Sequence, residues 1–545
     1  MIVHCSEMAD VKRVGTIASL KAALASRRIG AVTLQSFSSG LPLGLVWIAL
    51  PAFLTYRGVD IRTVGLFSLA QMPWSFKFLW SPLMDRFGPR LFGMGRRRSW
   101  ILICQLFLML AILALAAFAE ADVGVIAVLA LLVAFGSASQ DIVIDAYAVE
   151  VLERSEQGLA VGARNALARS AVLIAGAVTI TTGQRLGWPP VFTALALLFV
   201  PLAGVVFWSP EAAVTIPPPR TLRQAVFDPL IELFRRSGAL PILGFLVLYK
   251  FGENLATALI RPFLIQKCYA PEDVGVGTAT IGLIALIVGA FLGGLATDRL
   301  GLTRSLWLFG VIQSVGFLGY IAIDRLTPGS PCAGGLVGVV VQPLSHRLVM
   351  LTAIGVENFC QGMATGAFGV MLLRMTQKQF SATQYALFSS IFAVGRIVTG
   401  PIAGFTADAV GWTPFYLLAT AASIPGLLLL QRFAPLGARE PALEALERAP
   451  SRPVTRLGLA ATSVGIAVAG FAAALGVAAL LAALKAARLD PSHHVAFASA
   501  LARVLAPAAP ADWARLGGLL VIGLISGAGA AAFLLARHGV ERRKP

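Results

Sequence analysis

The sequence predicts an all-α integral membrane protein made of two six-helix bundles and two additional C-terminal transmembrane helices. The first observation is composition, because 57% of the 545 residues are hydrophobic and only 13% are charged. A soluble domain carries about twice that share of charged residues. The second is the recurrence of apolar stretches of about 20 residues, the length that crosses a bilayer. The third is that two proline-containing polar segments, 209–238 and 432–455, divide these stretches into groups.

The apolar stretches are predicted to be helices, since a lipid-exposed strand edge would leave backbone polar groups without hydrogen-bond partners. From the number and length of the stretches we expect about 14 spanning helices. The predicted spans are 29–55, 61–83, 99–119, 123–147, 158–183, 189–208, 239–266, 275–296, 303–323, 348–373, 382–406, 411–431, 456–486 and 515–537.

The same pattern divides the chain into seven segments. The first segment, residues 1–28, is polar and basic and lacks the apolar core of a signal peptide. The first linker contains Pro217–Pro219, a stiff spacer, and an expected amphipathic helix near 221–236 at the inner membrane surface. The segments are a cytoplasmic stretch 1–28, a six-helix bundle 29–208, a cytoplasmic linker 209–238, a second six-helix bundle 239–431, a second cytoplasmic linker 432–455, two extra transmembrane helices 456–537 and a cytoplasmic tail 538–545.

The net charge of +17 is interpreted as a topology signal, because loops rich in Lys and Arg stay in the cytoplasm. The densest clusters are Arg96–Arg98, Arg235–Arg236 and Arg542–Lys544, and counting loops alternately places all three inside. Both termini are therefore expected in the cytoplasm. No basic face is interleaved with stacking aromatics, so we expect no nucleic-acid partner.

Two loops repeat an Asp-Arg motif, Asp85–Gly88 after the second predicted span and Asp298–Gly301 after the eighth. A carboxylate and a guanidinium at helix ends can form pairs that hold one conformation closed. The first motif resembles the one that the major facilitator superfamily carries in this loop, although Ser81 stands where a glycine is usual. An ordinary positive-inside loop is the alternative. The residues assigned to gating are Asp85, Arg86, Asp298 and Arg299.

Charged residues inside the predicted spans are candidates for a structural or functional role, because each costs about 3 kcal/mol in lipid. Lys250 and Glu253 lie one helical turn apart near the middle of the seventh span. We expect a central polar cavity that binds an ionic substrate and carries protons. The alternatives are that the charges only neutralise one another between helices, or that Asp141 and Asp145 form an inner gate. The expected substrate-binding residues are Lys77, Arg169, Lys250 and Arg396, and the expected proton-coupling residues are Asp141, Asp145, Glu253 and Glu357.

The aromatic residues Trp47, Trp74 and Tyr249 lie near these charges. Aromatic faces suit sugar rings, although aromatics in spans more often pack or form interfacial belts. The cysteines and histidines show no metal-ligand spacing and no catalytic pattern, so we expect no metal, no cofactor and no enzyme. Most cysteines are expected to be small core residues, with a disulfide between Cys268 and Cys332 as the less favoured alternative.

Several longer strings of residues, spread over the first twelve predicted spans, resemble one family. They are similar to the AmpG-type muropeptide permeases of Gram-negative bacteria, which are major facilitators. Glu253 stands where this family often has Asp, and the last two helices match only in number and position. The strings are Ser38–Leu43, Phe76–Arg86, Ser137–Ala146, Leu248–Glu253, Phe380–Leu387 and Gly395–Gly404.

The resemblance implies a secondary transporter of the bacterial inner membrane. Such permeases import peptidoglycan fragments, GlcNAc–1,6-anhydroMurNAc and its peptides, by proton-coupled alternating access. They serve cell-wall recycling and, in some bacteria, β-lactamase induction. Stem-peptide carboxylates can pair with the basic residues named above, and sugars can stack on Trp47 or Trp74. The expected partners are anhydro-muropeptides, protons and the lipid bilayer, and the expected state is a monomer.

Two alternatives stay open. The same superfamily contains acetyl-coenzyme A carriers, and the basic residues would suit that anion or another anionic solute. A non-transporting membrane receptor or scaffold on the same fold would tolerate removal of the charges on Lys250 and Glu253. The two extra helices are rich in Ala, Gly and Leu, and we expect them to pack outside the bundle through small residues.

Overall fold

The structure, a computed structural model, is entirely helical in the residues that it describes. These residues form two compact units, which are described separately. The first unit comprises Met1–Ala225 and Pro241–Leu443, and the second comprises Val226–Leu240 and Glu444–Pro545. The described ranges are 26–60, 67–212, 217–235, 239–326, 343–438, 440–441, 455–489, 497–507 and 510–538.

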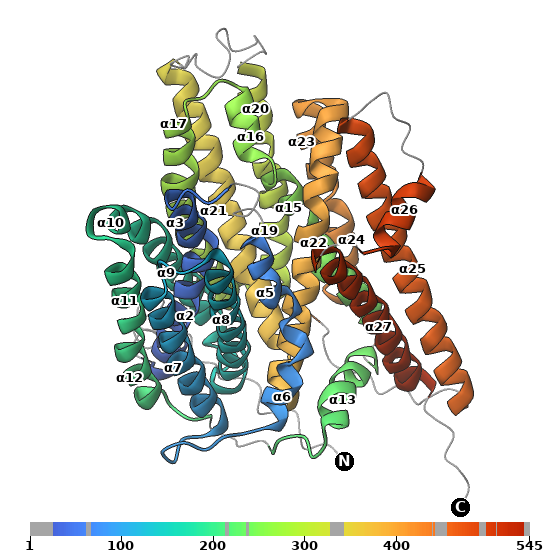
Figure 1. Ribbon diagram of the computed structural model, residues 1–545. Helices are drawn as coiled ribbons and strands as arrows, with labels where there is room; N and C mark the ends of the chain where they lie inside the picture. The colour runs from blue at the N-terminus through green and yellow to red at the C-terminus, as the bar shows by residue number, and fades with distance from the viewer. Residues whose placement is uncertain are drawn as a thin grey trace, which may run out of the picture. The chain divides into compact units, whose positions relative to one another are not determined.

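The N-terminal half of the first unit contains the first six predicted spans (Figure 1). The second of them is a chain of short pieces rather than one helix. Pro73 and Pro82 lie in the first turns of two of these pieces, where proline is tolerated because the backbone N–H there has no helical acceptor. The helices are α2 (Arg27–Gly44), α3 (Leu50–Tyr56), α5 (Met72–Phe76), α6 (Ser81–Arg86), α7 (Arg96–Ala117), α8 (Val123–Val151), α9 (Gln157–Leu173), α10 (Thr179–Leu186), α11 (Trp188–Leu197) and α12 (Phe199–Trp208).

The C-terminal half of the first unit contains the next six predicted spans. The seventh span is also interrupted, and Lys250 and Glu253 lie at the junction of its first two helices. The helices are α14 (Ala239–Leu248), α15 (Phe251–Thr257), α16 (Ile260–Gln266), α17 (Pro271–Gly275), α18 (Gly282–Leu300), α19 (Leu302–Gly316), α20 (Leu318–Leu326), α21 (Leu344–Met375), α22 (Ser381–Val410), α23 (Trp412–Ala421) and α24 (Ile424–Phe433).

Each half has an apolar core of its own. One cluster of buried residues runs from Leu41 to Leu202 and includes Leu108 and Phe192. The other cluster lies between Leu255 and Ala419. The halves meet where α9 packs against α18 and α8 packs against α22. This arrangement agrees with two bundles, while the predicted boundaries at 208 and 239 stay predictions.

Eleven helices among the described residues are long and apolar enough to cross a membrane. α21 and α22 contain 32 and 30 residues but are not among the eleven. The second predicted span is absent from that set too, since it is not one continuous helix. The protein is therefore an all-helical, multi-pass membrane protein, and the count of about 14 spans stays a prediction.

The second unit contains α13 (Leu222–Arg235) from Val226 on, where the amphipathic helix was expected, with α25 (Arg456–Leu489), α26 (Phe497–Leu505) and α27 (Pro510–His538). Small residues let α25 and α27 approach closely: a Cβ atom at Gly527 would lie 2.8 Å from the backbone oxygen of Ser463. Phe234 of α13 packs edge-on against Phe533 of α27, with ring centroids 5.5 Å apart.

The expectation about the cysteines needs one correction. Cys104 and Cys360 are buried free thiols, as expected for core residues. Cys268, however, is disulfide-bonded, and Cys332, the partner considered above, lies outside the described residues. The turn that contains Cys268 joins α16 to α17 at the end of the bundle opposite to the Asp-Arg loops. Disulfides persist in oxidising compartments such as the periplasm, so this turn has the chemistry expected of an outer loop.

Candidate functional site

The N-terminal half holds a buried ion cluster around Asp145 of α8. The Nζ atom of Lys77 lies 3.4 Å from an Asp145 carboxylate oxygen, and Arg164 of α9 pairs with the other oxygen. Asp145 and Lys77 are both almost fully buried. One turn earlier on α8, Asp141 accepts a hydrogen bond from the Ser39 hydroxyl. Three helices thus bring Lys77, Asp145 and Arg164 together, and Asp145 compensates part of the charge of both cations.

Arg164 was not among the residues selected from the sequence. Arg169, which was selected, lies on the same helix but is exposed. The sequence signal for Arg164 was a basic residue near the inner end of the fifth span, which the positive-inside pattern explains equally well. Tyr385 of α22 lies close to Arg164, so this cluster also reaches the C-terminal half.

The C-terminal half holds a second buried ion pair. Lys250 is 1% exposed and pairs with Glu253, and its Nζ also donates to the Thr365 hydroxyl at 3.0 Å. Glu253 accepts two further hydrogen bonds, one from the amide of Gln313 and one of 2.8 Å from that of Gln361. Residues of α15, α19 and α21 therefore converge on one carboxylate. The sequence indicated the pair by its spacing, whereas the two glutamines come from distant helices.

Glu357 of α21 has a different environment. Its side chain is fully buried, and one carboxyl oxygen accepts from the Tyr320 hydroxyl at 3.2 Å and from the Asn358 amide at 3.0 Å. The other oxygen, Oε1, has no hydrogen-bond partner in the protein. Glu357 and Gln361 line a cavity of about 420 Å³ in this half, together with Thr257, Arg261, Thr278 and Asn358.

The aromatic candidates differ in how they are placed. Trp47 and Trp74 pack edge to face with ring centroids 5.9 Å apart. The indole N–H of Trp74 is buried without an acceptor in the protein, and Trp47 is 36% exposed. Tyr249 is buried, donates its hydroxyl to the backbone oxygen of Leu306 and stacks on Phe368. Trp47 is therefore partly exposed, and the Trp74 indole N–H has no acceptor among the described residues, whereas Tyr249 is engaged in packing and hydrogen bonding.

Asp85 joins the two halves at the end of the bundle where α6 finishes, which we name the predicted cytoplasmic end. Its carboxylate is fully buried and accepts from Arg97 at 2.6 Å. The same carboxylate accepts from the backbone N–H of Ala382 at 3.3 Å, and from the backbone N–H and hydroxyl of Thr383 at 2.8 and 2.7 Å. Because these N–H groups begin α22, the carboxylate of one half binds the N-terminus of a helix of the other half.

Asp298 makes the symmetrical contact in the opposite direction. It ends α18 in the C-terminal half and accepts from the backbone N–H groups of Gly158 and Leu159, both at 3.0 Å, at the start of α9 in the N-terminal half. Glycine permits this approach, because a Cβ atom at Gly158 would lie 2.3 Å from both Asp298 and the backbone oxygen of Gly294. We call the two contacts of Asp85 and Asp298 the end clamps.

The remaining sequence candidates lie beside the clamps or outside the described side chains. Arg86 donates to the backbone oxygen of Pro219 at 3.1 Å instead of pairing with Asp85. The ion-pair partner of Asp85 is Arg97, which the sequence showed only as part of a basic cluster. Arg299 is exposed at the end of α18. The side chain of Arg396 lies outside the described part of α22.

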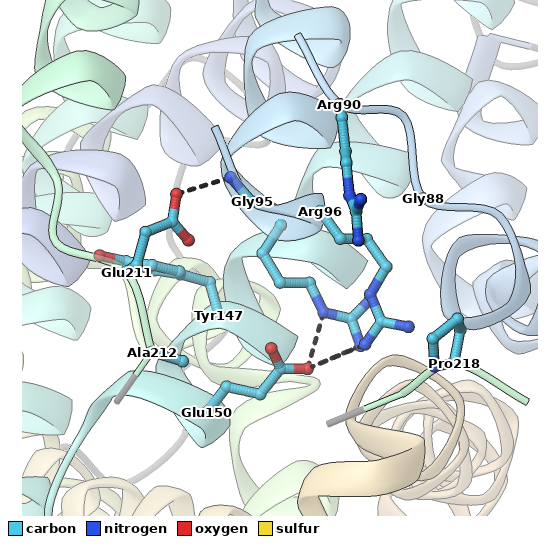
Figure 2. Close-up of a pocket in the computed structure, with 10 residues that line it drawn as sticks. Gly88, Arg90, Gly95, Arg96, Tyr147, Glu150, Glu211, Ala212 and Pro218 are labelled. Carbon is cyan, nitrogen blue, oxygen red and sulfur yellow. Dashed lines mark hydrogen bonds and ion pairs between the residues drawn. The ribbon is translucent and has the colours of Figure 1, made fainter. Parts of the chain in front are cut away.

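Arg97 belongs to a wider network at the same end. It donates to Glu150 at 2.8 Å and to the Ser381 hydroxyl at 2.7 Å, and Ser381 in turn donates to Glu150 at 2.6 Å. Figure 2 shows Glu150 beside Arg96, with which it forms an ion pair of 3.6 Å. It also shows the Glu211 carboxylate facing the backbone N–H of Gly95, which donates to it at 2.7 Å. A buried arginine that bridges carboxylates on two helices and a serine of the other half fixes the clamp geometry.

Comparisons with known proteins agree with this architecture. A sequence profile of the Major Facilitator Superfamily matches residues 32–333. The chain is 40% identical over 407 residues to the anhydromuropeptide permease of Escherichia coli K12, covering 74% of this chain and 79% of that protein. It is 33% identical to an uncharacterized protein of Haemophilus influenzae, over 77% of this chain and 97% of the other.

A solved structure of the proton:xylose symporter XylE of the same superfamily matches this fold with a TM-score of 0.53, at 13% identity, over 77% of this chain and 99% of that one. At this identity the likeness concerns the fold alone.

Proposed function

Because the chain belongs to the major facilitator superfamily and, within it, to the family of the anhydromuropeptide permeases, we propose that it imports peptidoglycan fragments across the bacterial inner membrane. It is a transporter and not an enzyme. The relative with 40% identity is named for anhydromuropeptides, which favours this substrate class over acetyl-coenzyme A. The proposed substrates are GlcNAc–1,6-anhydroMurNAc and its peptides.

The proposed transport mechanism rests mainly on the two end clamps. Asp85 and Asp298 each bind the N-terminus of a helix in the opposite half. Both contacts lie at the predicted cytoplasmic end, so together they hold that end closed. Opening that end requires both clamps to separate, as expected when one half rocks against the other around a central site. This supports alternating access, with substrate entering from the opposite end.

The substrate is proposed to bind between the charged clusters. Stem-peptide carboxylates would pair with Lys77 or Lys250, each of which already has a carboxylate partner that it can exchange. The sugars would stack on Trp47, with the free indole N–H of Trp74 as a hydrogen-bond donor. The proposed binding set is Lys77, Arg169, Lys250, Arg396, Trp47 and Trp74, without Tyr249, which is buried and packed on Phe368. The proposed proton-coupling set is Asp141, Asp145, Glu253 and Glu357.

Uptake of radiolabelled GlcNAc–anhydroMurNAc into right-side-out membrane vesicles tests the proposed function. We expect uptake that collapses when a protonophore is added, since a proton moving inward down 100 mV releases about 2.3 kcal/mol. Unlabelled anhydro-muropeptide should compete with the label, and acetyl-coenzyme A should not. Vesicles that contain the inserted protein but take up nothing would exclude this substrate class.

The proposed orientation has its own test at Cys268. In intact spheroplasts, a membrane-impermeant maleimide is expected to modify Cys268 only after an impermeant reductant has opened its disulfide, because the turn then faces the medium. Peptide mass spectrometry measures the modification. As a control, a cysteine introduced at the exposed Arg90, at the predicted cytoplasmic end, should react only after permeabilisation. The reverse pattern would invert the topology.

The two extra helices are expected to be dispensable. They belong to the second compact unit, and both apolar cores and both clamps lie within the first. A chain that ends at residue 450 should therefore insert normally and keep at least about half of the uptake, which corresponds to less than about 0.5 kcal/mol in the rate-limiting barrier. Loss of uptake by an inserted, truncated chain would give these helices a role in transport.

A further inference from the structure

The cavity beside Glu357 has a mixed lining. Its lining residues include the polar or charged Thr257, Thr278, Asn358 and Arg261 and the apolar Ala258, Ile260, Pro262 and Ile354. Residues 257–262 follow Glu253 along α15 and α16 toward the disulfide-bonded turn, so the cavity lies on the predicted periplasmic side of the central ion pair. A cavity of about 420 Å³ is large enough to hold several water molecules.

Glu357 lies in the wall of this cavity and differs from the other buried carboxylates. Asp85, Asp145 and Glu253 each have a Lys or Arg within ion-pair distance. Among the residues that the structure describes, Glu357 has none, and its Oε1 atom has no partner at all. An ionised Glu357 would be a buried charge without a cation, and binding a proton removes that charge.

The groups that face Glu357 come from every helix packed around it. From α20 the Tyr320 hydroxyl donates to it, and the Tyr416 hydroxyl of α23, buried and without a partner, lies near it. Among the residues that the structure describes, its charged and titratable neighbours are Lys250, Glu253, Arg261, Tyr320, Cys360 and Tyr416. Neither of the two nearby cations forms an ion pair with Glu357. Lys250 is bound to Glu253, and the side chain of Arg261 is exposed.

The same cavity is linked to the central ion pair through one lining residue, Gln361. Gln361 lies one turn after Glu357 on α21, lines the cavity, and donates its amide to Glu253. Glu253 is in turn bound to Lys250. A carboxylate of a substrate that pairs with Lys250 would therefore release Glu253 from its cation, and a proton on Glu357 would lie one hydrogen-bonded residue away.

We propose that this cavity is the entry route for the coupled proton, and that Glu357 is the residue that takes the proton up from the predicted periplasmic side. The proposal rests on the proposed function and names the group that carries its coupling ion. The proton arrives as hydronium, binds to the free Oε1 atom of Glu357, and moves on through cavity water to Glu253 when substrate occupies Lys250. No other bond is made or broken. Glu357 is then the first member of the proposed proton-coupling set to bind the proton, and Glu253 is the next.

The experiment uses the full-length protein in proteoliposomes that contain a pH-sensitive dye. Two quantities are measured: exchange of labelled for unlabelled GlcNAc–anhydroMurNAc at equal pH, which needs no net proton movement, and substrate-induced acidification of the interior. The variants are Glu357→Gln, which mimics the protonated carboxyl, and Thr278→Phe, which fills the cavity and leaves Glu357 in place. Glu272→Gln, an exposed residue at the same end, is the matched control.

Glu357→Gln is expected to keep exchange within about twofold of the wild type and to lose at least about tenfold in acidification and in accumulation driven by an acidic exterior. Thr278→Phe should slow acidification more than exchange, and Glu272→Gln should change neither. Unchanged acidification in Glu357→Gln overturns the proposal. If Glu357→Gln does not fold, unchanged acidification in Thr278→Phe overturns it. Absence of exchange by the wild type instead contradicts the proposed substrate, so the two failures are distinguishable.

Discussion

Replacing Asp85 by Asn is expected to lower uptake by about tenfold or more while the amount of inserted protein stays unchanged. Asp85 receives four hydrogen bonds, one from Arg97 and three from the first residues of α22. A hydrogen bond to a charged group contributes about 1.5–3 kcal/mol, and each 1.4 kcal/mol is a factor of about ten in an equilibrium. An Asn side chain removes the charge and points an N–H group at donors, so the closed predicted cytoplasmic end should lose its main contact.

The conformational part of this prediction can be measured directly. A cysteine introduced at Ala382, which is fully buried beneath the clamp, should react with maleimide faster in the Asp85→Asn background. Glu211→Gln is the matched control, because Glu211 lies at the same end but binds only Gly95 and Arg98 of its own half. Asp298→Asn should have a smaller effect than Asp85→Asn, since Asp298 accepts hydrogen bonds from two backbone N–H groups and forms no ion pair within the described part of the chain. An equal reaction rate at Ala382 in all backgrounds would contradict the clamp.

Replacing Lys250 by Met is expected to lower the thermal stability of the protein and to abolish uptake. The substitution keeps the volume of the side chain but leaves Glu253 as a buried charge whose other bonds come from the neutral amides of Gln313 and Gln361. Removing one partner of a buried pair costs about 3–5 kcal/mol. The purified variant should unfold at a lower temperature than the wild type, and its uptake should be abolished.

The double variant Lys250→Met/Glu253→Gln separates stability from transport. With both charges removed, most of the thermal stability should return, because replacing a whole buried pair is often close to neutral. Uptake should stay absent if the pair binds substrate. A stable double variant with normal uptake would mean that the charges only hold helices together. Lys267→Met/Asp324→Asn is the control, since this pair, 2.6 Å apart, lies near the end of the same bundle, and its removal should leave uptake in place.

The candidate site could be predicted from the sequence only where the relevant partners are close along the chain. Lys250 and Glu253 are three residues apart, so helical periodicity alone places them on one face, and the structure pairs them. Asp85 and Asp298 were recognisable because their loops repeat a motif. In contrast, Arg164 and Arg97 became candidates only through contacts with carboxylates on other helices. Several basic residues at helix ends look alike in sequence, and burial distinguishes them.

What the sequence by itself determined is the membrane character, the helical fold class and the family. These depend on apolar length, on the low share of charge and on strings of neighbouring residues, all of which are local properties. The tertiary structure decided which charges meet, and it placed Asp85 on the N-terminus of α22 and left Glu357 without a cation. The physical reason is that a buried charge is stabilised by partners within a few ångströms in space. In a bundle of long helices, those partners come from segments that are up to 298 residues apart along the chain.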